Sequence, residues 1–377
     1  MIPLRVLHAL PDIRGAEWEA FQTLAVYLVA DGHEHALLLP EGLKVPGSTF
    51  FPLISVPTRW FPWWTRPEPA AARAITAWMP DLLHIHHPSC LALALPLARQ
   101  LDLPVTCVLH SPSHLALLRR LRDPRIACTT VLGEHHRAGL IAGLGLSRNR
   151  VAVLPCGVSA PKNPTISPKT GPMTIGALGP DHPAAGLDRL AQALARVNTV
   201  ERPLRLRLLP DPTRPDADRE ALTDLAHRHG NAVEISVATN TTSLSDFIDG
   251  IDGFVALAPD PHPWPLLTAL ARGRPALTTV TGTAAELLPE GSSLALLIAP
   301  DDELALDEAL IEMADPRHRQ AAHADGQRII SEQCDAALVA RAQAELWRAA
   351  LTGGQHHGAN ELSSVWKRAT ASRMRRP

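Results

Sequence analysis

Short apolar runs alternate with longer amphipathic stretches through the first part of the chain. Between Gly15 and Ala30, Phe21, Leu24 and Leu28 recur at the spacing of one helix face, which predicts a helix over this range. Strands alternating with helix-length segments predict βαβ units and a parallel sheet covered on both faces. The runs that read as buried strands are Leu4–Leu10, His35–Leu39, Leu82–His86, Val105–His110, Cys128–Leu132 and Val151–Leu154.

The alternation is interrupted at residues 159–172 and then begins again. This segment holds four prolines and almost no large apolar residue, which is typical of an interdomain linker. The sequence therefore predicts a first domain over residues 1–158 and a second over residues 173–335. The second contains strands Thr174–Leu178, Leu204–Leu209, Val233–Val237, Gly253–Leu257, Pro275–Thr279 and Leu294–Ile298, and helices Leu187–Arg196 and Arg219–His229.

The end of the sequence has two parts of opposite character. Ala336–Ala350 has the pattern of an amphipathic helix, which defines a predicted C-terminal helix over residues 336–352. Residues 353–377 are polar and basic, with five Lys or Arg against one Glu, which predicts a disordered tail.

Composition excludes several classes of protein. A chain of 377 residues, 46% hydrophobic and 20% charged, can bury the cores of two domains. Its net charge of −2 gives no signal for nucleic-acid binding. The five cysteines are scattered and lack a Cys-x-x-Cys pair, which favours a reducing compartment and argues against structural zinc. We find no signal-peptide pattern and no apolar stretch of about 18 residues, so the sequence predicts a cytoplasmic protein.

Six motifs in a fixed order carry a resemblance to a known family over residues 4–350. Together they are similar to the motifs of retaining family 4 glycosyltransferases, whose signature is two glutamates eight positions apart followed by Ala-x-Ala-x-Gly-x-Pro. The motifs are the Gly15 loop in Pro11–Glu17, Asp81–His86, Val105–His110, Val153–Val158, Asp260–Pro275 and Gly282–Glu286.

The resemblance implies the GT-B architecture, with two Rossmann-like doubly wound domains facing a cleft. It further implies an acceptor on the first domain, a nucleotide-sugar donor on the second, and a C-terminal helix (336–352) that packs back across the domains. Neither a cofactor nor a bound metal is implied, the nucleotide-sugar being a substrate. His84 and His86 share a strand face, but no convergent carboxylate or cysteine supports a metal site there.

Two candidate site residues of the first domain follow predicted strands. Gly15 precedes a helix N-terminus, where backbone N–H groups and the helix dipole can approach an anion. His110 ends a strand, and strand carboxyl ends are where sites gather in open α/β folds. The resemblance implies that Gly15 lies under the sugar-phosphate and that His110 bonds the donor sugar. The alternatives are a plain tight turn and a packed surface histidine.

The donor pocket of the second domain departs from the family pattern. Asp260 keeps a carboxylate at the first signature position, whereas Thr268 replaces the second glutamate. Ala177 and His182 stand where the family has the arginine and lysine that neutralise the diphosphate. Glu286 closes the Gly-x-x-x-Glu turn. We therefore expect Asp260 in catalysis and His182, Thr268 and Glu286 in donor binding.

An aromatic segment between two arginines, Arg59–Arg66, contains Trp60, Trp63 and Trp64. Tryptophan prefers the membrane–water interface, which predicts a peripheral contact with the inner face of a membrane. The equal alternative is an aromatic loop packed against the cleft or lining an acceptor pocket.

These features predict a glycosyltransferase that moves a sugar from a nucleotide-sugar to a glycan or lipid-linked acceptor with retention of configuration. The lost donor-site charges leave one alternative, a catalytically impaired homologue that serves as a non-catalytic partner or scaffold in glycan biosynthesis. An active enzyme must supply other cations for the diphosphate, whereas a non-catalytic homologue need not. The presence of such cations therefore separates the two alternatives.

Overall fold

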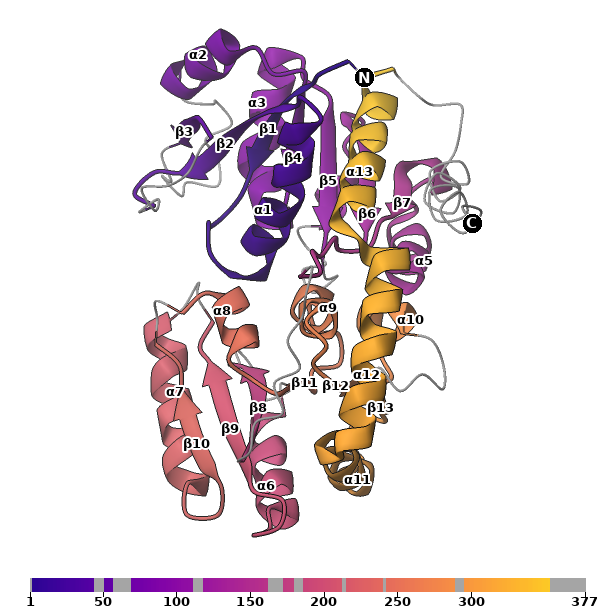
Figure 1. The fold of residues 1–377 in the computed structure, drawn as a ribbon. Helices are drawn as coiled ribbons and strands as arrows, with labels where there is room; N and C mark the ends of the chain where they lie inside the picture. The colour runs from indigo at the N-terminus through magenta and orange to yellow at the C-terminus, as the bar shows by residue number, and fades with distance from the viewer. Residues whose placement is uncertain are drawn as a thin grey trace. The chain divides into compact units, whose positions relative to one another are not determined.

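The computed structural model describes residues 2–43, 51–56, 69–110, 118–161, 172–179, 186–211, 215–239, 242–288 and 295–352. The chain forms two compact units (Figure 1). Unit 1 comprises Met1–Gly157 and the segment from Ala336 onward, and unit 2 comprises Val158–Asp335. His182, the tryptophans 60, 63 and 64, linker residues 162–171 and the predicted tail lie outside the described residues.

Unit 1 is built on a parallel sheet of seven strands in the order β3-β2-β1-β4-β5-β6-β7. Each strand is short, and most residues of the inner strands are buried, because helices cover both faces. The strands are β1 (Arg5–Ala9), β2 (Glu34–Pro40), β3 (Leu53–Val56), β4 (Leu82–Ile85), β5 (Val105–Leu109), β6 (Ile126–Val131) and β7 (Val151–Val153).

The two faces of this sheet bury different side chains. Along β1, Leu7 and Ala9 join the core under helices α2 (Pro69–Trp78), α3 (Leu91–Leu101) and α5 (Glu134–Leu144). Val6 and His8 point to the opposite face, toward α1 (Gly15–Ala30) and α13 (Ala336–Leu351). This alternation follows from the two-residue period of a strand.

Helix α13 completes unit 1 although it follows unit 2 in the sequence. It lies beside α1 (Figure 1) and packs Ala340, Ala344 and Trp347 against Leu4, Val6, Leu28 and Leu82. Trp347 is 1% exposed, so its ring is fully within this core.

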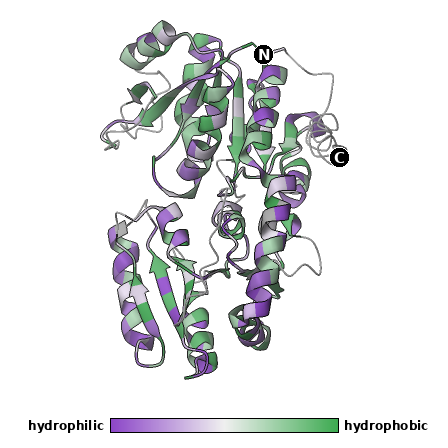
Figure 2. Cartoon of the chain, viewed as in Figure 1, coloured by the Kyte–Doolittle hydropathy of each residue, from purple (hydrophilic) through white to green (hydrophobic). Residues whose placement is uncertain are grey.

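Unit 2 repeats the design with six parallel strands in the order β10-β9-β8-β11-β12-β13. The strands are β8 (Met173–Leu178), β9 (Leu204–Leu209), β10 (Glu234–Val237), β11 (Gly253–Ala256), β12 (Ala276–Thr279) and β13 (Ala295–Ile298). The helices are α6 (Leu187–Val197), α7 (Pro215–His229), α8 (Leu244–Asp249), α9 (Pro263–Ala271), α10 (Gly282–Leu287), α11 (Glu303–Ala314) and α12 (Pro316–Ile329). The inner strands are mostly hydrophobic, whereas α7 is largely hydrophilic (Figure 2).

Both sheets are doubly wound. In chain order, the first strand of each unit lies beside the fourth, β1 beside β4 and β8 beside β11, and the later strands are added outward from that pair. The prediction of two Rossmann-like α/β domains is confirmed. No helix among the described residues is both long enough and apolar enough to span a bilayer.

Two elements differ from what the pattern predicts. Strand β3 was not expected, because Leu53–Val56 is a four-residue edge strand that buries only alternate side chains. Helix α7 begins at Pro215, one turn before the expected Arg219, because a proline fits the first turn of a helix without losing a hydrogen bond.

Candidate functional site

The candidate residues gather at the carboxyl edge of each sheet. In unit 1 the winding reverses between β1 and β4, and in unit 2 between β8 and β11. Gly15 follows β1, His110 follows β5, and Asp260 follows β11. Open α/β sheets bind ligands in the crevice beside such reversals. Topology alone therefore brings these predicted residues to the binding edge of their units.

Gly15 opens α1 in the left-handed region, with φ of 83°. The N-cap residue, Arg14, makes no side-chain cap; its guanidinium instead pairs with Asp12, at 2.8 Å for Nε–Oδ1 and 2.6 Å for Nη2–Oδ2. The side chain of the N-cap residue therefore does not cover the N-terminus of this 16-residue helix. This geometry suits the predicted contact with a sugar-phosphate.

His110 lies one residue beyond β5 and is half-buried. Its imidazole is close enough to His86 to contribute to the lowered pKa of that residue. His86 follows β4, the strand at the winding reversal, so the His110 ring belongs to the binding edge of unit 1.

Behind this edge, four histidines form a buried cluster on the α1/α13 face of the sheet. His8 contacts His86 at 2.9 Å (Nδ1–Nε2) and His35 at 2.8 Å (Nε2–Nδ1). His84 completes the set; we call His8, His35, His84 and His86 the histidine cluster. All four are at most 6% exposed.

The cluster is held in its neutral form. Trp347 Nε1 can only donate, and it donates to His84 Nδ1 at 3.3 Å, so Nδ1 carries no proton. Burial, reinforced by neighbouring imidazoles, lowers the pKa of His84 to about 3 and that of His35 to about 4. Burial likewise holds the pKa of His8 and His86 well below the ordinary value. The predicted absence of a metal site at His84 and His86 stays a prediction.

Asp260 is fixed by the helix that follows the next strand. Its Oδ1 accepts a hydrogen bond from the backbone N–H of Thr283 in α10 at 3.1 Å. Gly282, with φ of +80°, lets α10 approach; a Cβ here would lie 2.6 Å from Asp260 Oδ1 and 2.9 Å from Pro259 O. The Gly282 turn and the Asp260 loop thus pack closely against each other.

Replacing Gly282 with alanine is expected to destabilise unit 2 and displace the Asp260 carboxylate. The left-handed φ costs about 1–2 kcal/mol for a residue with a Cβ, and the contact with Pro259 and Asp260 backbone atoms adds to it. Thermal unfolding measures the loss. Gly42→Ala is the matched control, because Gly42 has φ of +89° and a Cβ there would meet no described atom within 4 Å. Equal losses in the two variants would contradict the close packing of α10 on the Asp260 loop.

Helix α9 begins at Pro263, three residues after Asp260, and has two prolines in its first turn. Pro263 and Pro265 have no N–H, and the N–H of Trp264 donates to His262 Nδ1 at 3.2 Å. The first turn therefore has few amides left for a phosphate.

Thr268 lies in the middle of α9 and is 2% exposed. Its Oγ1 has no hydrogen-bond partner among the described residues, and the same holds for Nε1 of Trp264 one turn earlier on the same side of the helix. Two buried polar atoms in this condition are unusual in a folded protein.

Two further donor-side positions, 177 and 286, lie in β8 and α10. Ala177 is 1% exposed within β8 and packs in the apolar core of unit 2, so position 177 presents no side chain to a ligand. Glu286 is exposed in α10.

Sequence reasoning missed two arginines near helix starts, one in each unit. Arg189 lies in the first turn of α6, which follows β8, and its Nη1 pairs with Asp301. Arg137 begins the second turn of α5, which follows β6, and its Nη1 pairs with Glu134. In both, Nε and Nη2 are buried and find no partner in the described part of the chain. In the sequence, the only sign of a functional role for these arginines is their position near the start of a helix. Many solvent-exposed arginines have the same position, so it does not identify a site.

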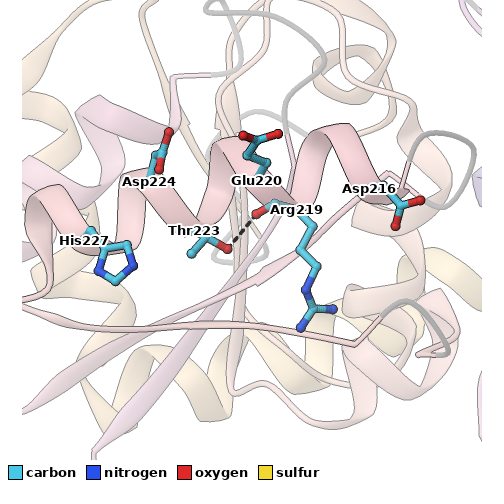
Figure 3. A pocket seen from close by; sticks show the side chains of 6 residues that line it. All are labelled: Asp216, Arg219, Glu220, Thr223, Asp224 and His227. Carbon is cyan, nitrogen blue, oxygen red and sulfur yellow. Dashed lines mark hydrogen bonds between the residues drawn. The ribbon is translucent and has the colours of Figure 1, made fainter.

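A surface hollow lies along helix α7 (Figure 3). It is lined by Asp216, Arg219, Glu220, Thr223, Asp224 and His227, all from this one helix. None of the predicted site residues contributes to it, so we do not assign the donor or acceptor site there.

Comparisons with known families support the arrangement. Residues 20–160 match the model described as glycosyltransferase family 4, and residues 172–315 match the model described as glycosyl transferases group 1. A comparison with curated proteins finds no match.

Solved structures share the fold at low identity. Sucrose-phosphate synthase from Thermosynechococcus elongatus superposes with a TM-score of 0.75 at 15% identity, covering 93% of this chain and 99% of that one. Anabaena HepE in complex with UDP-glucose gives 0.72 at 17%, covering 92% and 100%. WaaG, a glycosyltransferase involved in lipopolysaccharide biosynthesis, gives 0.67 at 16%, covering 90% and 99%. The two domain matches, carried on two Rossmann-like units, indicate that the chain is a glycosyltransferase of the GT-B fold.

Proposed function

We propose that the protein transfers a sugar from a nucleotide-sugar to a glycan or lipid-linked acceptor with retention of configuration. The observation that carries this is the preorganised Asp260 loop, bonded to α10 at the winding reversal of unit 2. Solved relatives of the fold contain UDP or UDP-glucose, which supports a nucleotide-sugar as the donor.

In this reaction an acceptor hydroxyl forms a bond to the anomeric carbon while the bond from that carbon to the diphosphate oxygen breaks. The hydroxyl proton passes to the leaving diphosphate or to water. Asp260 would hold the sugar hydroxyls, and His110 would bond the sugar from unit 1. The hydroxyl of Thr268 has no partner among the described residues. It would form one hydrogen bond with the nucleotide, either as donor or as acceptor.

The departing diphosphate requires positive charge, and Ala177 cannot provide it. Arg189 is our candidate, because it lies at the start of the helix after β8 with Nε and Nη2 unpartnered within the described residues. His182 remains a second candidate donor-binding residue, as does Glu286 on α10. Arg189 and His182 together would replace the cations that the sequence pattern lacks.

The acceptor would bind unit 1. The relation to WaaG, a glycosyltransferase of lipopolysaccharide biosynthesis, favours a lipid-linked glycan. Contact with the cytoplasmic face of a membrane through Trp60, Trp63 and Trp64 remains part of this proposal. All five cysteines are buried and none of them forms a disulfide, which fits a reducing compartment.

Donor binding is tested with a thermal-shift panel of UDP-, GDP- and ADP-sugars. A donor at 100 times its dissociation constant should add about 2.7 kcal/mol to the free energy of unfolding. Arg189→Gln should weaken that donor about tenfold or more, since a charge-assisted contact is lost. If no nucleotide-sugar stabilises the protein at millimolar concentration, the enzymatic proposal fails and the scaffold interpretation takes its place.

Catalysis is tested with Asp260→Asn. The amide oxygen can still accept the Thr283 N–H, so the loop should keep its position, whereas the negative charge is lost. We expect the turnover number to fall by about 10²–10³, with little change in melting temperature. Asp302→Asn is the control, because Asp302 also caps a helix of unit 2, accepting from Ala305 N at 2.9 Å, but lies outside the candidate site. Equal activity of the two variants would remove Asp260 from the mechanism.

A further inference from the structure

Two backbone carbonyls just before Asp260 accept hydrogen bonds from threonine side chains at the carboxyl end of β12. Thr279 Oγ1 donates to Ala258 O at 3.0 Å. Thr281 Oγ1 donates to Pro259 O at 2.7 Å. Because side chains alternate along an extended chain, the two threonines project to the same side, toward the loop. The loop that carries Asp260 is therefore attached to the neighbouring strand end by two hydroxyl groups.

The sequence of the loop explains why hydroxyl groups make these bonds. Asp260 stands between Pro259 and Pro261, and neither proline has a backbone N–H. The loop has few donors of its own, so its backbone bonds to the neighbouring segment run mainly through carbonyl oxygens, which need donors. Thr279 and Thr281 supply those donors.

Thr281 makes its bond in place of the one that its position in the helix offers. It is the N-cap residue of α10, with extended φ and ψ of −103° and 158°, yet its side chain caps no N–H of the helix. A threonine at an N-cap usually accepts a hydrogen bond from the second or third N–H of the helix. Here the second N–H, that of Thr283, is bonded to Asp260 Oδ1 at 3.1 Å. Asp260 thus caps α10, and Thr281 in return holds the loop that carries Asp260.

The hydroxyl of Thr281 has one hydrogen, and the distances show where it lies. Its oxygen is 2.7 Å from Pro259 O and 3.1 Å from Thr279 Oγ1. The shorter contact has the length of a good O–H···O bond, so we assign the hydrogen to Pro259. Thr279 is 0% exposed, so no bulk water can replace its bond to Ala258 O. Both hydroxyls are therefore satisfied only while the loop keeps this position.

The preceding residue of the same strand shows that a hydroxyl here is not bonded by default. Thr278 is also 0% exposed, but its Oγ1 has no partner within the described part of the chain. Removing such a hydroxyl breaks no hydrogen bond, whereas removing the Thr281 hydroxyl leaves Pro259 O without its donor. Thr278 is therefore a matched control for the two bonded threonines.

We propose that Thr281 is a positioning residue of the sugar-transfer site, with Thr279 beside it in the same role. Its bond to Pro259 O fixes the peptide that leads into Asp260, and so holds the Asp260 carboxylate where it binds the sugar hydroxyls. This inference rests on the proposed function, which gives Asp260 its part in the reaction. It adds a residue that acts on the substrate only through Asp260.

The first test measures kcat and KM for the donor that the thermal-shift panel identifies, with water as the acceptor and release of the nucleoside diphosphate as the signal. Thr281→Val keeps the size of the side chain and loses the hydroxyl; it should lower kcat about tenfold, because a misplaced group is costly in the transition state. KM should stay within about twofold, since the nucleotide contacts are unchanged. Thr281→Ser keeps the hydroxyl and should restore kcat. Thr278→Val should behave as wild type.

A double-mutant cycle tests the route of the effect. If Thr281 acts through the carboxylate, Thr281→Val should cause no further loss of kcat once Asp260→Asn is present. An equal loss in both backgrounds would show that Thr281 acts by another route, and it would overturn the inference.

A second measurement does not depend on activity. Amide hydrogen exchange at Thr283 reports on the bond from its N–H to Asp260 Oδ1. Exchange there should be at least about tenfold faster in Thr281→Val and unchanged in Thr281→Ser. The N–H of Ala305, which Asp302 Oδ1 accepts at 2.9 Å, is the reference for unit 2 and should keep its rate, so that global destabilisation is recognised.

The two measurements separate this inference from the proposed function. An unchanged exchange rate at Thr283 in Thr281→Val would overturn the inference, as would equal acceleration at Thr283 and Ala305. If no nucleotide-sugar binds while exchange at Thr283 alone responds, Thr281 does hold the Asp260 loop, and only the proposed function fails.

Discussion

Lowering the pH from 7 to 4 is expected to unfold unit 1 through its histidine cluster. The folded-state pKa is about 4 for His35 and about 3 for His84, against an ordinary value of 6.5. Below pH 6.5 the unfolded chain therefore binds more protons than the folded one, so the free energy of unfolding falls as pH falls. At pH 4 the two groups together would cost about 6 kcal/mol, which is comparable to the whole stability of a typical domain.

The diagnostic window is pH 6.5 to 5, where carboxyl groups of ordinary pKa are still ionised. Calorimetry of the full chain across this window should show the melting transition of unit 1 falling steeply. His84→Gln keeps an acceptor for Trp347 Nε1 but cannot titrate, so its transition should fall less. His227→Gln, at an exposed position of unit 2, should behave as wild type. A transition that does not move between pH 6.5 and 5 would contradict the neutral, buried cluster.

Replacing Trp347 with alanine is expected to cost unit 1 about 3–5 kcal/mol. The indole is fully buried between α1, β1 and β4, and its ring centroid lies 5.4 Å from that of His84 and 5.8 Å from that of His8. Trp347→Phe keeps most of the apolar contact and loses only the N–H bond to His84, so about 1–2 kcal/mol should be lost.

Chemical denaturation of the full chain measures both variants. Arg341→Ala, at an exposed position of the same helix, is the control and should change stability by less than about 0.5 kcal/mol. If Trp347→Ala resembles this control, α13 does not contribute to the core of unit 1 in solution.

Apolar periodicity was sufficient to predict the two sheets. Strands such as Val105–Leu109 and Leu204–Leu209 are runs of mostly buried residues, and their alternation with helices implies parallel sheets from the sequence alone. Strand β3 escaped prediction because an edge strand of four residues buries too few side chains to give a clear pattern. The strand order at the winding reversal is likewise invisible in a single apolar run, because it depends on which strands pair.

From the sequence motifs, we could predict which loops carry the candidate site residues, but not the contacts that these residues make. Gly15, His110 and Asp260 do follow strands at the binding edges, as expected from the order of elements. The bond between Asp260 and Thr283 joins residues 23 positions apart, and no spacing rule specifies it. Arg137 and Arg189 look like ordinary charged helix residues in the sequence, because burial and hydrogen-bond partners are properties of the packed structure.

The return of α13 to unit 1 has a consequence for the order of events during protein synthesis. The ribosome must make all of Val158–Asp335 before the helix that covers α1, β1 and β4 emerges. At about 5–20 residues per second, this delay lasts roughly 10–40 s. During that time Leu4, Val6, Leu28 and Leu82 have no covering helix, so the nascent chain presents an apolar face to chaperones. Unit 2, whose sequence is continuous, can fold first even though it is translated second.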